Sequence, residues 1–137
     1  MFDLTQALAG PYCTLILGDL GADVIKIESP EAGDQSRGWG PPFLNGESTY
    51  FLSVNRNKRS VALDLKSEAG RATARRLAER CDVLVENLRP GAAARLGLGP
   101  EDLRAANQRL VYCSVSGFGQ DQPRAGYDQI VQGTAGV

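Results

Sequence analysis

Two neighbouring stretches decide the fold of this chain: AGPYCTLILGDLGADVIKIE at residues 9–28 and GDQSRGW at residues 33–39. Gly10-Pro11 predicts the start of a helix, because proline is favoured in a helical first turn. Apolar residues then recur at helical spacing, and Gly21 falls where a left-handed C-terminal cap is expected. The β-branched run Val24–Ile27 predicts a strand. A helix, a strand and a polar loop that carries Arg37 therefore indicate the start of an α/β fold.

The same signals extend the pattern in both directions. Further strands are expected at Phe2–Thr5, Tyr50–Val54, Ser60–Leu65, Cys81–Glu86 and Leu110–Ser116, and helices at Ser67–Arg80, before Gly97, at Pro100–Ala106 and at Asp128–Ala135. Strands that alternate with helices predict a mainly parallel sheet with right-handed crossovers. The segment 29–48 is rich in Gly, Pro, Asp and Ser, and a loop of that length in a compact domain is usually functional or disordered.

Composition narrows the function classes. The 137 residues match one domain in size, and 42% hydrophobic with 23% charged residues is typical of a soluble globular protein. The net charge is −1 and the arginines are interleaved with acids, so no nucleic-acid partner is expected. No apolar run is long enough to span a bilayer and no leader pattern is visible, so no membrane partner and a cytoplasmic location are expected.

The chain contains no histidine. This absence removes the commonest general base and the commonest metal ligand. The three cysteines are far apart in sequence and each borders an apolar run, which indicates reduced thiols rather than a disulfide or a metal site. No pair of acids stands out as a catalytic dyad. We therefore assign no catalytic residue and no metal site within these 137 residues.

Cations follow several expected strands, on the side where parallel sheets collect ligands. They are Arg37, Lys66, Arg89 and Arg95. Guanidinium and ammonium groups suit a phosphate or diphosphate, but from the sequence alone solvated surface charge is the favoured explanation. Asn87 directly follows an apolar strand, where its amide fits either a ligand contact or a turn.

The aromatic residues allow two interpretations each. Trp39, with Pro41, Pro42 and Phe43, fits an adenine or acyl site, or a cover for the edge of the core. Tyr127 precedes an expected helix, where its hydroxyl fits a substrate contact or its ring a helix staple. Gly117-Phe118-Gly119 lacks the third glycine of a dinucleotide fingerprint and indicates a structural turn.

Taken in order, several motifs closely resemble the class III CoA-transferase (CaiB/BaiF) family. They are Asp3-Leu4-Thr5 with Ala9-Gly10-Pro11, Gly21–Glu28, Gly33-Asp34 with Arg37-Gly38, Asn57–Ser60 with Leu63–Lys66, Asp82–Asn87, and Gly126-Tyr127-Asp128. The match runs along essentially the whole chain but corresponds only to the N-terminal part of a family member. We expect residues 1–137 to be a fragment, one partial CoA-binding α/β domain.

The resemblance implies a Rossmann-like, mainly parallel sheet with flanking helices, and interlocked homodimers. It implies that acyl-CoA and a carboxylic acid are the substrates, with no tightly bound cofactor. On matching positions the CoA site would be lined by Arg37, Leu63, Lys66, Asn87, Leu88, Arg95 and Leu96, with Tyr127 near the acyl end.

The resemblance also implies a mechanism. Family transferases use an aspartate that attacks the acyl-CoA thioester to give an acyl anhydride and the CoA thiolate, and that aspartate lies beyond Val137. Leu8 stands where transferases usually carry glutamine. The α-methylacyl-CoA racemase branch has histidine where this chain has Tyr127, and a phenol, whose ordinary pKa is about 10, is a poor base for an α-proton. The resemblance thus favours a transferase over a racemase, with a catalytically inactive CoA-binding remnant as the other alternative.

Overall fold

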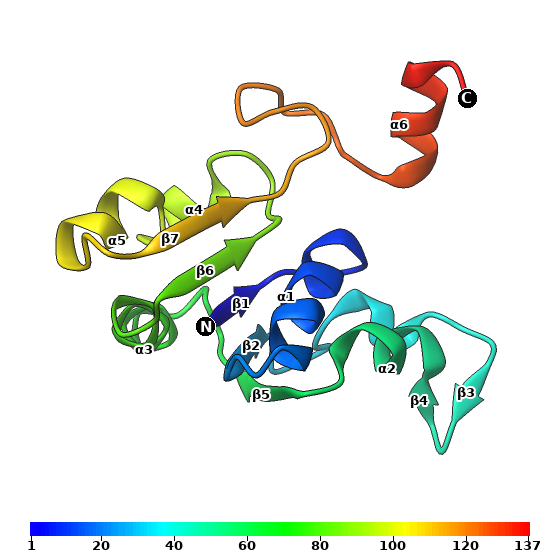
Figure 1. The fold of residues 1–137 in the computed structure, drawn as a ribbon, viewed down its shortest axis with the longest axis horizontal. Helices are drawn as coiled ribbons and strands as arrows, with labels where there is room; N and C mark the ends of the chain where they lie inside the picture. The colour runs from blue at the N-terminus through cyan, green and yellow to red at the C-terminus, as the bar shows by residue number, and fades with distance from the viewer.

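A computed structural model describes all residues from Met1 to Val137 and contains a five-stranded parallel sheet flanked by helices (Figure 1). The strands lie in the order β5-β2-β1-β6-β7, and every neighbouring pair is parallel. Their bounds are β1 Phe2–Leu4, β2 Val24–Glu28, β5 Lys58–Ala62, β6 Val83–Glu86 and β7 Val111–Ser114. The predicted α/β architecture with a parallel sheet is confirmed.

Helices occupy most of the intervening segments. They are α1 Ala9–Asp19, α2 Thr49–Asn55, α3 Glu68–Glu79, α4 Ala92–Arg95, α5 Pro100–Ala106 and α6 Asp128–Ala135, with a 3-10 turn η1 at Gln35–Gly38. A small antiparallel hairpin joins β3 Phe43–Leu44 to β4 Glu47–Ser48. None of the helices combines the length and the apolar composition that a bilayer crossing requires.

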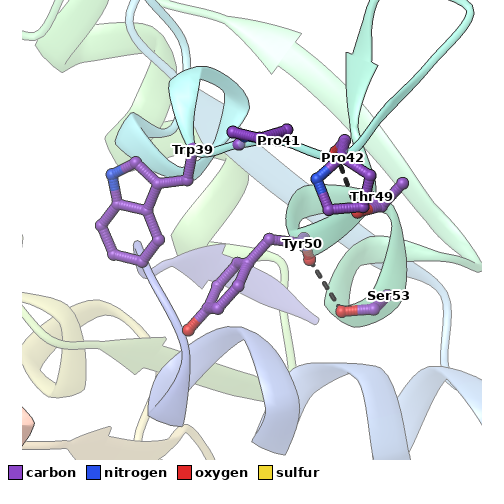
Figure 2. Close-up of a pocket in the computed structure, with 7 residues that line it drawn as sticks. Trp39, Pro41, Pro42, Thr49, Tyr50 and Ser53 are labelled. Carbon is purple, nitrogen blue, oxygen red and sulfur yellow. Dashed lines mark hydrogen bonds between the residues drawn. The ribbon is translucent and has the colours of Figure 1, made fainter.

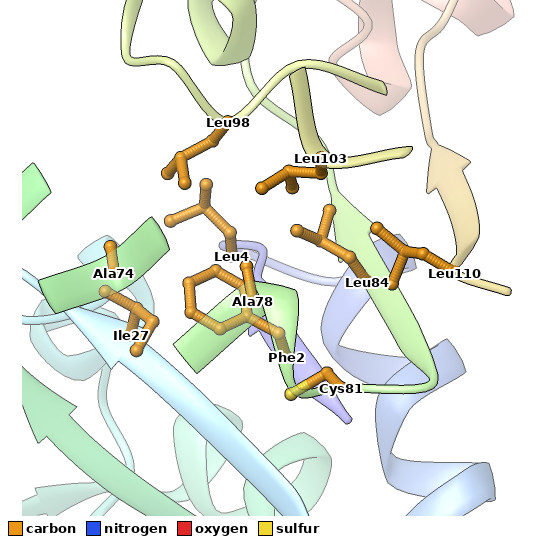
Figure 3. Packing of buried hydrophobic residues seen from close by; sticks show 10 residues of the cluster. All are labelled: Phe2, Leu4, Ile27, Ala74, Ala78, Cys81, Leu84, Leu98, Leu103 and Leu110. Atoms are coloured by element: carbon orange, nitrogen blue, oxygen red, sulfur yellow. The ribbon is translucent and has the colours of Figure 1, made fainter. Parts of the chain in front are cut away.

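The two faces of the central strand β1 are buried differently. Phe2 and Leu4 point into the apolar core, where they meet residues of α3 such as Ala74 and Ala78 (Figure 3). Asp3 points to the other face, where its carboxylate accepts a hydrogen bond from the Thr14 hydroxyl of α1 at 2.7 Å. Because alternate strand residues face opposite sides, α1 and α3 cover opposite faces of the sheet.

The apolar core lies on the α3 side of the sheet. Phe2 and Leu84 are fully buried there, and Leu98 and Leu103 close the cluster from the α4–α5 segment (Figure 3). Burial of each such side chain contributes about 2 kcal/mol. This packing fixes β1 beside β6, which matters because the loops that follow these two strands form the candidate site.

One predicted element is wrong. Residues 50–54 were expected as a strand but lie in helix α2. The Ser48 hydroxyl caps this helix by accepting a hydrogen bond from the Phe51 N–H at 3.2 Å, and the buried residues Phe51, Val54 and Asn55 recur at helical spacing. Aromatic and β-branched composition favours a strand, but the cap and the helical period of burial decide the local structure.

The bounds of the fifth strand also differ from the expected Ser60–Leu65. Asn57 adopts a positive φ of 60°, a conformation that asparagine tolerates better than most residues. The chain turns there, so β5 begins at Lys58 and ends at Ala62. Leu63 to Lys66 therefore belong to the loop at the carboxyl end of the strand, where a ligand can reach them.

Candidate functional site

The candidate site lies at the carboxyl edge of the sheet, between β1 and β6. These two strands are neighbours in the sheet. After β1 the chain continues into α1 on one face of the sheet, and after β6 it continues into α4 and α5 on the other face. The strand order reverses at this point, and open parallel sheets bind ligands in the crevice that such a switch point creates. The residues after β1 are Thr5–Leu8, and those after β6 begin with Asn87.

Asn87 joins the two loops across this crevice. Its side-chain Oδ1 accepts a hydrogen bond from the Gln6 backbone N–H at 2.9 Å, and its Nδ2 donates to the Gln6 carbonyl at 2.8 Å. The amide thus pairs with the Gln6 backbone as a neighbouring strand would. Both polar atoms of the Asn87 side chain are occupied within the chain.

Glu86, the last residue of β6, shapes the turn that carries Asn87. Its Oε2 accepts a hydrogen bond from the Leu88 N–H at 2.8 Å, and its Oε1 accepts one from the Ser114 hydroxyl at the end of β7. Glu86 is buried, so these bonds also satisfy a carboxylate that lacks water. The turn after β6 is therefore held by the neighbouring strand.

A buried ion pair lies beneath the loop after β1. The Lys26 ammonium is 2.8 Å from Asp34 Oδ2, and it donates a second hydrogen bond to the Thr5 carbonyl at 2.7 Å. Asp34 Oδ1 accepts hydrogen bonds from the Ser36 N–H and the Ala7 N–H. Ala7 has a positive φ of 68°, an uncommon and costly conformation for a residue with a side chain.

Helix α1 begins at this site without a capping side chain. Leu8 occupies the N-cap position and makes no side-chain cap, and no acid lies in the first turn. The free N–H groups of an uncapped helix start, together with the helix dipole, favour a nearby anion. Gly10 packs directly on Thr5, since a Cβ there would lie 2.5 Å from the Thr5 Cβ.

Arg37, the best sequence candidate for a phosphate contact, is already paired. Its Nε and NH2 groups donate to the two Glu28 carboxylate oxygens at 2.7 and 2.9 Å, and its guanidinium lies 3.8 Å from the centre of the Phe51 ring. Burial alone would raise the pKa of Glu28, but the hydrogen bonds from Arg37 and Ser60 lower it to about 2. The third guanidinium nitrogen, NH1, pairs with the exposed Glu47 carboxylate at 3.2 Å, so every nitrogen of this 32% exposed side chain has an anionic partner within the chain.

Lys66, Arg89 and Arg95 differ from Arg37 in having no ion pair or side-chain hydrogen bond within the chain. Lys66 lies in the loop after β5, Arg89 in the turn after β6, and Arg95 at the end of α4, and all three are exposed. Exposed cations without protein partners are available to an anionic ligand.

The three leucines of the expected CoA site have a structural role as well. Leu63, Leu88 and Leu96 are half-buried and pack against the apolar core. Leu63 lies in the same loop as Lys66, Leu88 lies between Asn87 and Arg89, and Leu96 follows Arg95. The structure thus brings the residues around Asn87 to one edge, with these leucines anchoring their loops.

An aromatic pocket of about 440 Å³ lies beside this edge (Figure 2). Trp39 and Tyr50 form its wall, with ring centres 4.9 Å apart in an edge-to-face arrangement, and Pro41, Pro42 and Ser53 complete the lining. The Trp39 indole N–H and the Tyr50 hydroxyl have no acceptor within the chain. The pocket therefore combines aromatic and proline faces with polar residues, a lining that suits a small organic group.

Tyr127 is exposed at the N-cap position of α6. The pKa of Tyr50 is raised by burial and also by the carboxylates of Asp34 and Asp128. Tyr127 is not among the residues that line the aromatic pocket. A phenol with a raised pKa acts there as a neutral donor.

Sequence reasoning missed the buried polar residues beneath the site. Lys26 lies within an apolar run and Asp34 within a loop, and both are almost completely buried. Lys58 is likewise buried against Asp3, with 3.1 Å between Nζ and Oδ2. The sequence did offer one indication of this. Lys26 and Glu28 are charged residues at alternate positions of β2, a pattern that indicates a polar face of the strand.

A parallel α/β sheet with a switch-point crevice and unpaired cations at its carboxyl edge defines the class of open α/β domains. Comparison with known proteins agrees with that class. Residues 1–137 match the model of CoA-transferase family III along their whole length. The chain belongs to this family.

Relatives of known activity support the same assignment. Succinyl-CoA:glutarate CoA-transferase of Mus musculus is 53% identical over 140 residues, which cover 100% of this chain and 32% of the mouse protein. Acetyl-CoA:oxalate CoA-transferase of Acetobacter aceti is 49% identical over 140 residues, covering 100% of this chain and 36% of that protein. The chain thus spans about a third of the length of these relatives.

A solved structure gives the corresponding result for the fold. A CAIB/BAIF family protein from Brucella suis superposes with a TM-score of 0.92 at 47% identity. The superposition covers 99% of this chain and 38% of the Brucella protein. The fold described above is therefore the N-terminal part of the fold of that family.

Proposed function

We propose that residues 1–137 form the CoA-binding part of an acyl-CoA:carboxylate CoA-transferase. The observation that carries this proposal is the set of unpaired cations, Lys66, Arg89 and Arg95, in the segments after β5 and β6 of a family member. CoA carries a diphosphate and a ribose phosphate, and such groups are bound in proteins by ammonium and guanidinium groups.

The leucines and the loop backbone would make the remaining contacts with CoA. Leu63, Leu88 and Leu96 supply apolar surface for the adenine and pantetheine parts of CoA, while Asn87 and its neighbours line the crevice with backbone. Arg37 would contribute through NH1, by exchanging its exposed partner Glu47 for a phosphate, because Nε and NH2 are bound to Glu28. The uncapped start of α1 offers N–H groups to an anionic or carbonyl oxygen of the ligand.

The acyl end of the ligand is assigned to the aromatic pocket. Trp39 and Tyr50 supply its aromatic walls, and Tyr127, at the N-cap of α6, is assigned to the same end of the ligand by the family resemblance alone. Names of the relatives range from oxalate to glutarate as acceptors, so the acyl donor and the acceptor acid of this protein are left open. A racemase gains no support, because Tyr127 stands where the racemase branch carries histidine as its base.

In the whole protein the chemistry would be carried by an aspartate outside these residues. Its carboxylate would attack the thioester carbonyl, forming an acyl anhydride and releasing the CoA thiolate. We further propose a homodimer in the cytoplasm, with CoA as a substrate and no tightly bound cofactor.

Calorimetric titration of the 137-residue chain with CoA tests the binding part of this proposal. Lys66→Ala and Arg95→Ala should each weaken CoA binding by about five- to tenfold, because each removes one charge-assisted contact. Arg104→Ala is the matched control, since Arg104 is an exposed arginine at the end of α5 that leads to the amino end of β7. Unchanged affinity in both site variants, or an equal loss in the control, would refute the assignment.

A further inference from the structure

The segment Thr5–Ala7 at the switch point has almost all of its backbone polar groups held by side chains from elsewhere. The Thr5 N–H donates to Asp3 Oδ1 at 3.0 Å, and the Thr5 carbonyl accepts from Lys26 at 2.7 Å. The Gln6 N–H and carbonyl both pair with Asn87. The Ala7 N–H donates to Asp34 at 3.2 Å.

The side chains that make these hydrogen bonds come from both sides of the crevice. Asp3, Lys26 and Asp34 are buried beneath the segment on the β1–β2 side, whereas Asn87 reaches it from the end of β6. The positive φ of Ala7 persists only where the surroundings over-determine it. Asn87 is the one side chain that reaches this segment across the switch point, and it continues the β1–β6 pairing beyond the last pair, Leu4 and Glu86.

The segment leads directly into α1. Leu8 is the N-cap of the helix, and Gly10 rests against Thr5 without room for a side chain. A shift of Gln6 therefore moves the free N–H groups at the start of α1. The Gln6 side chain is exposed and its amide has no hydrogen-bond partner within the chain.

We propose that Asn87 is a positioning residue, which acts on the CoA ligand through Gln6 by holding the start of α1 at its binding distance. Each polar atom of the Asn87 amide makes one hydrogen bond to the Gln6 backbone, and we assign the side chain the role of ordering the crevice. This inference rests on the proposed CoA-binding function and deepens it.

Two variants of Asn87 and one control test the inference. Asn87→Ala removes both bonds to Gln6, while Asn87→Asp keeps an acceptor for the Gln6 N–H and loses the donor to its carbonyl. Asn107→Ala is the control, because the Asn107 side chain also makes two hydrogen bonds to distant backbone, from Nδ2 to the carbonyls of Glu79 and Cys81 at 3.2 and 3.0 Å. That bridge lies before the amino end of β6, away from the crevice.

Hydrogen exchange of the Gln6 amide and CoA affinity are then measured on each variant of the 137-residue chain. Asn87→Ala should raise the Gln6 exchange rate and the CoA dissociation constant by about tenfold each. Asn87→Asp should show a smaller rise in exchange, and Asn107→Ala should change neither quantity. The Asp variant keeps the test decisive if the Ala variant does not fold.

The outcomes separate the two claims. If the unmodified, folded chain binds no CoA, the proposed function is wrong. The hydrogen-exchange measurement then tests only whether Asn87 orders Gln6. If CoA binds but Gln6 exchange is unchanged in the Asn87 variants, the positioning role is refuted. It is also refuted if exchange rises while CoA affinity stays the same, or if Asn107→Ala weakens binding equally.

Discussion

Lys26 and Asp34 form an ion pair that is closed to solvent, with 2.8 Å between Nζ and Oδ2 and side-chain exposures of 1% and 0%. Lys26 comes from the middle of β2 and Asp34 from the loop before η1. Each partner also holds the backbone of the loop after β1, at Thr5 and at Ala7. The pair therefore connects the stability of the domain to the geometry of the candidate site.

Removal of one charge from this pair should be costly. Asp34→Asn leaves the Lys26 ammonium buried without an anion, and we expect a loss of about 3–5 kcal/mol in the free energy of unfolding. Urea denaturation measures this. Asp23→Asn is the control, since the Asp23–Arg59 pair is 69% and 67% exposed and should contribute less than about 1 kcal/mol. Similar losses in both variants would contradict the assignment of a special role to the buried pair.

Stability should fall in acid. The pKa of Glu28 is about 2 in the folded chain against an ordinary 4.5, and that of Asp34 is also lowered. The unfolded chain therefore binds more protons as the pH falls below about 5, so the stabilisation is complete above the ordinary pKa and is lost toward pH 2. Glu28 alone contributes about 3 kcal/mol to this change.

Urea denaturation between pH 7 and pH 3 measures that dependence. In Glu28→Gln the slope should be smaller, because the titrating group with the largest cited shift is absent. A folded chain with the same stability at pH 3 as at pH 7 would show that these carboxylates are not the sensitive groups.

Ala7 should tolerate glycine and reject a branched residue. At φ 68° the glycine backbone is unstrained, so Ala7→Gly should change the free energy of unfolding by less than about 1 kcal/mol. Ala7→Val should destabilise by about 2 kcal/mol, because a β-branched side chain fits this region worst. Thermal or urea unfolding compares the two, and equal stability of the Gly and Val variants would contradict the positive φ.

The 137-residue chain alone should not transfer acyl groups. The proposed nucleophile lies outside it, and the role proposed for the crevice residues is to bind and orient CoA. Acyl exchange between succinyl-CoA and glutarate, the pair in the name of the mouse relative, is a suitable assay. Acyl exchange above background by the purified chain would contradict the proposal that the nucleophile lies outside these residues.

Local signals predicted much of the fold. The Ser67 cap and the amphipathic residues that follow it predict α3, and Pro100 at the first position predicts α5, as the structure confirms. The prediction of a strand at Tyr50–Val54 was wrong because composition outweighed the capping signal of Ser48. Short-range rules succeed where the local pattern and the burial agree.

The site was less predictable, for a physical reason. Asn87 and Gln6 are 81 positions apart, and nothing near either residue in sequence indicates that the amide of one pairs with the backbone of the other. Likewise, Arg37 is recognisable as a cation beside an expected ligand edge, but its bidentate pairing with Glu28 depends on how the loop folds back on β2. Long-range polar contacts of this kind follow from tertiary structure alone.

The most direct test of the central claim is an NMR titration. CoA is added to the 137-residue chain while the chemical shifts of the backbone amides are recorded. Binding at the carboxyl edge predicts saturable shifts at Gln6–Ala9, Lys66, Asn87 and Arg95. The opposite edge, around Asp23, Arg80 and Asp82, should remain unchanged. Shifts confined to that opposite edge, or none at millimolar CoA in a folded chain, would contradict the account.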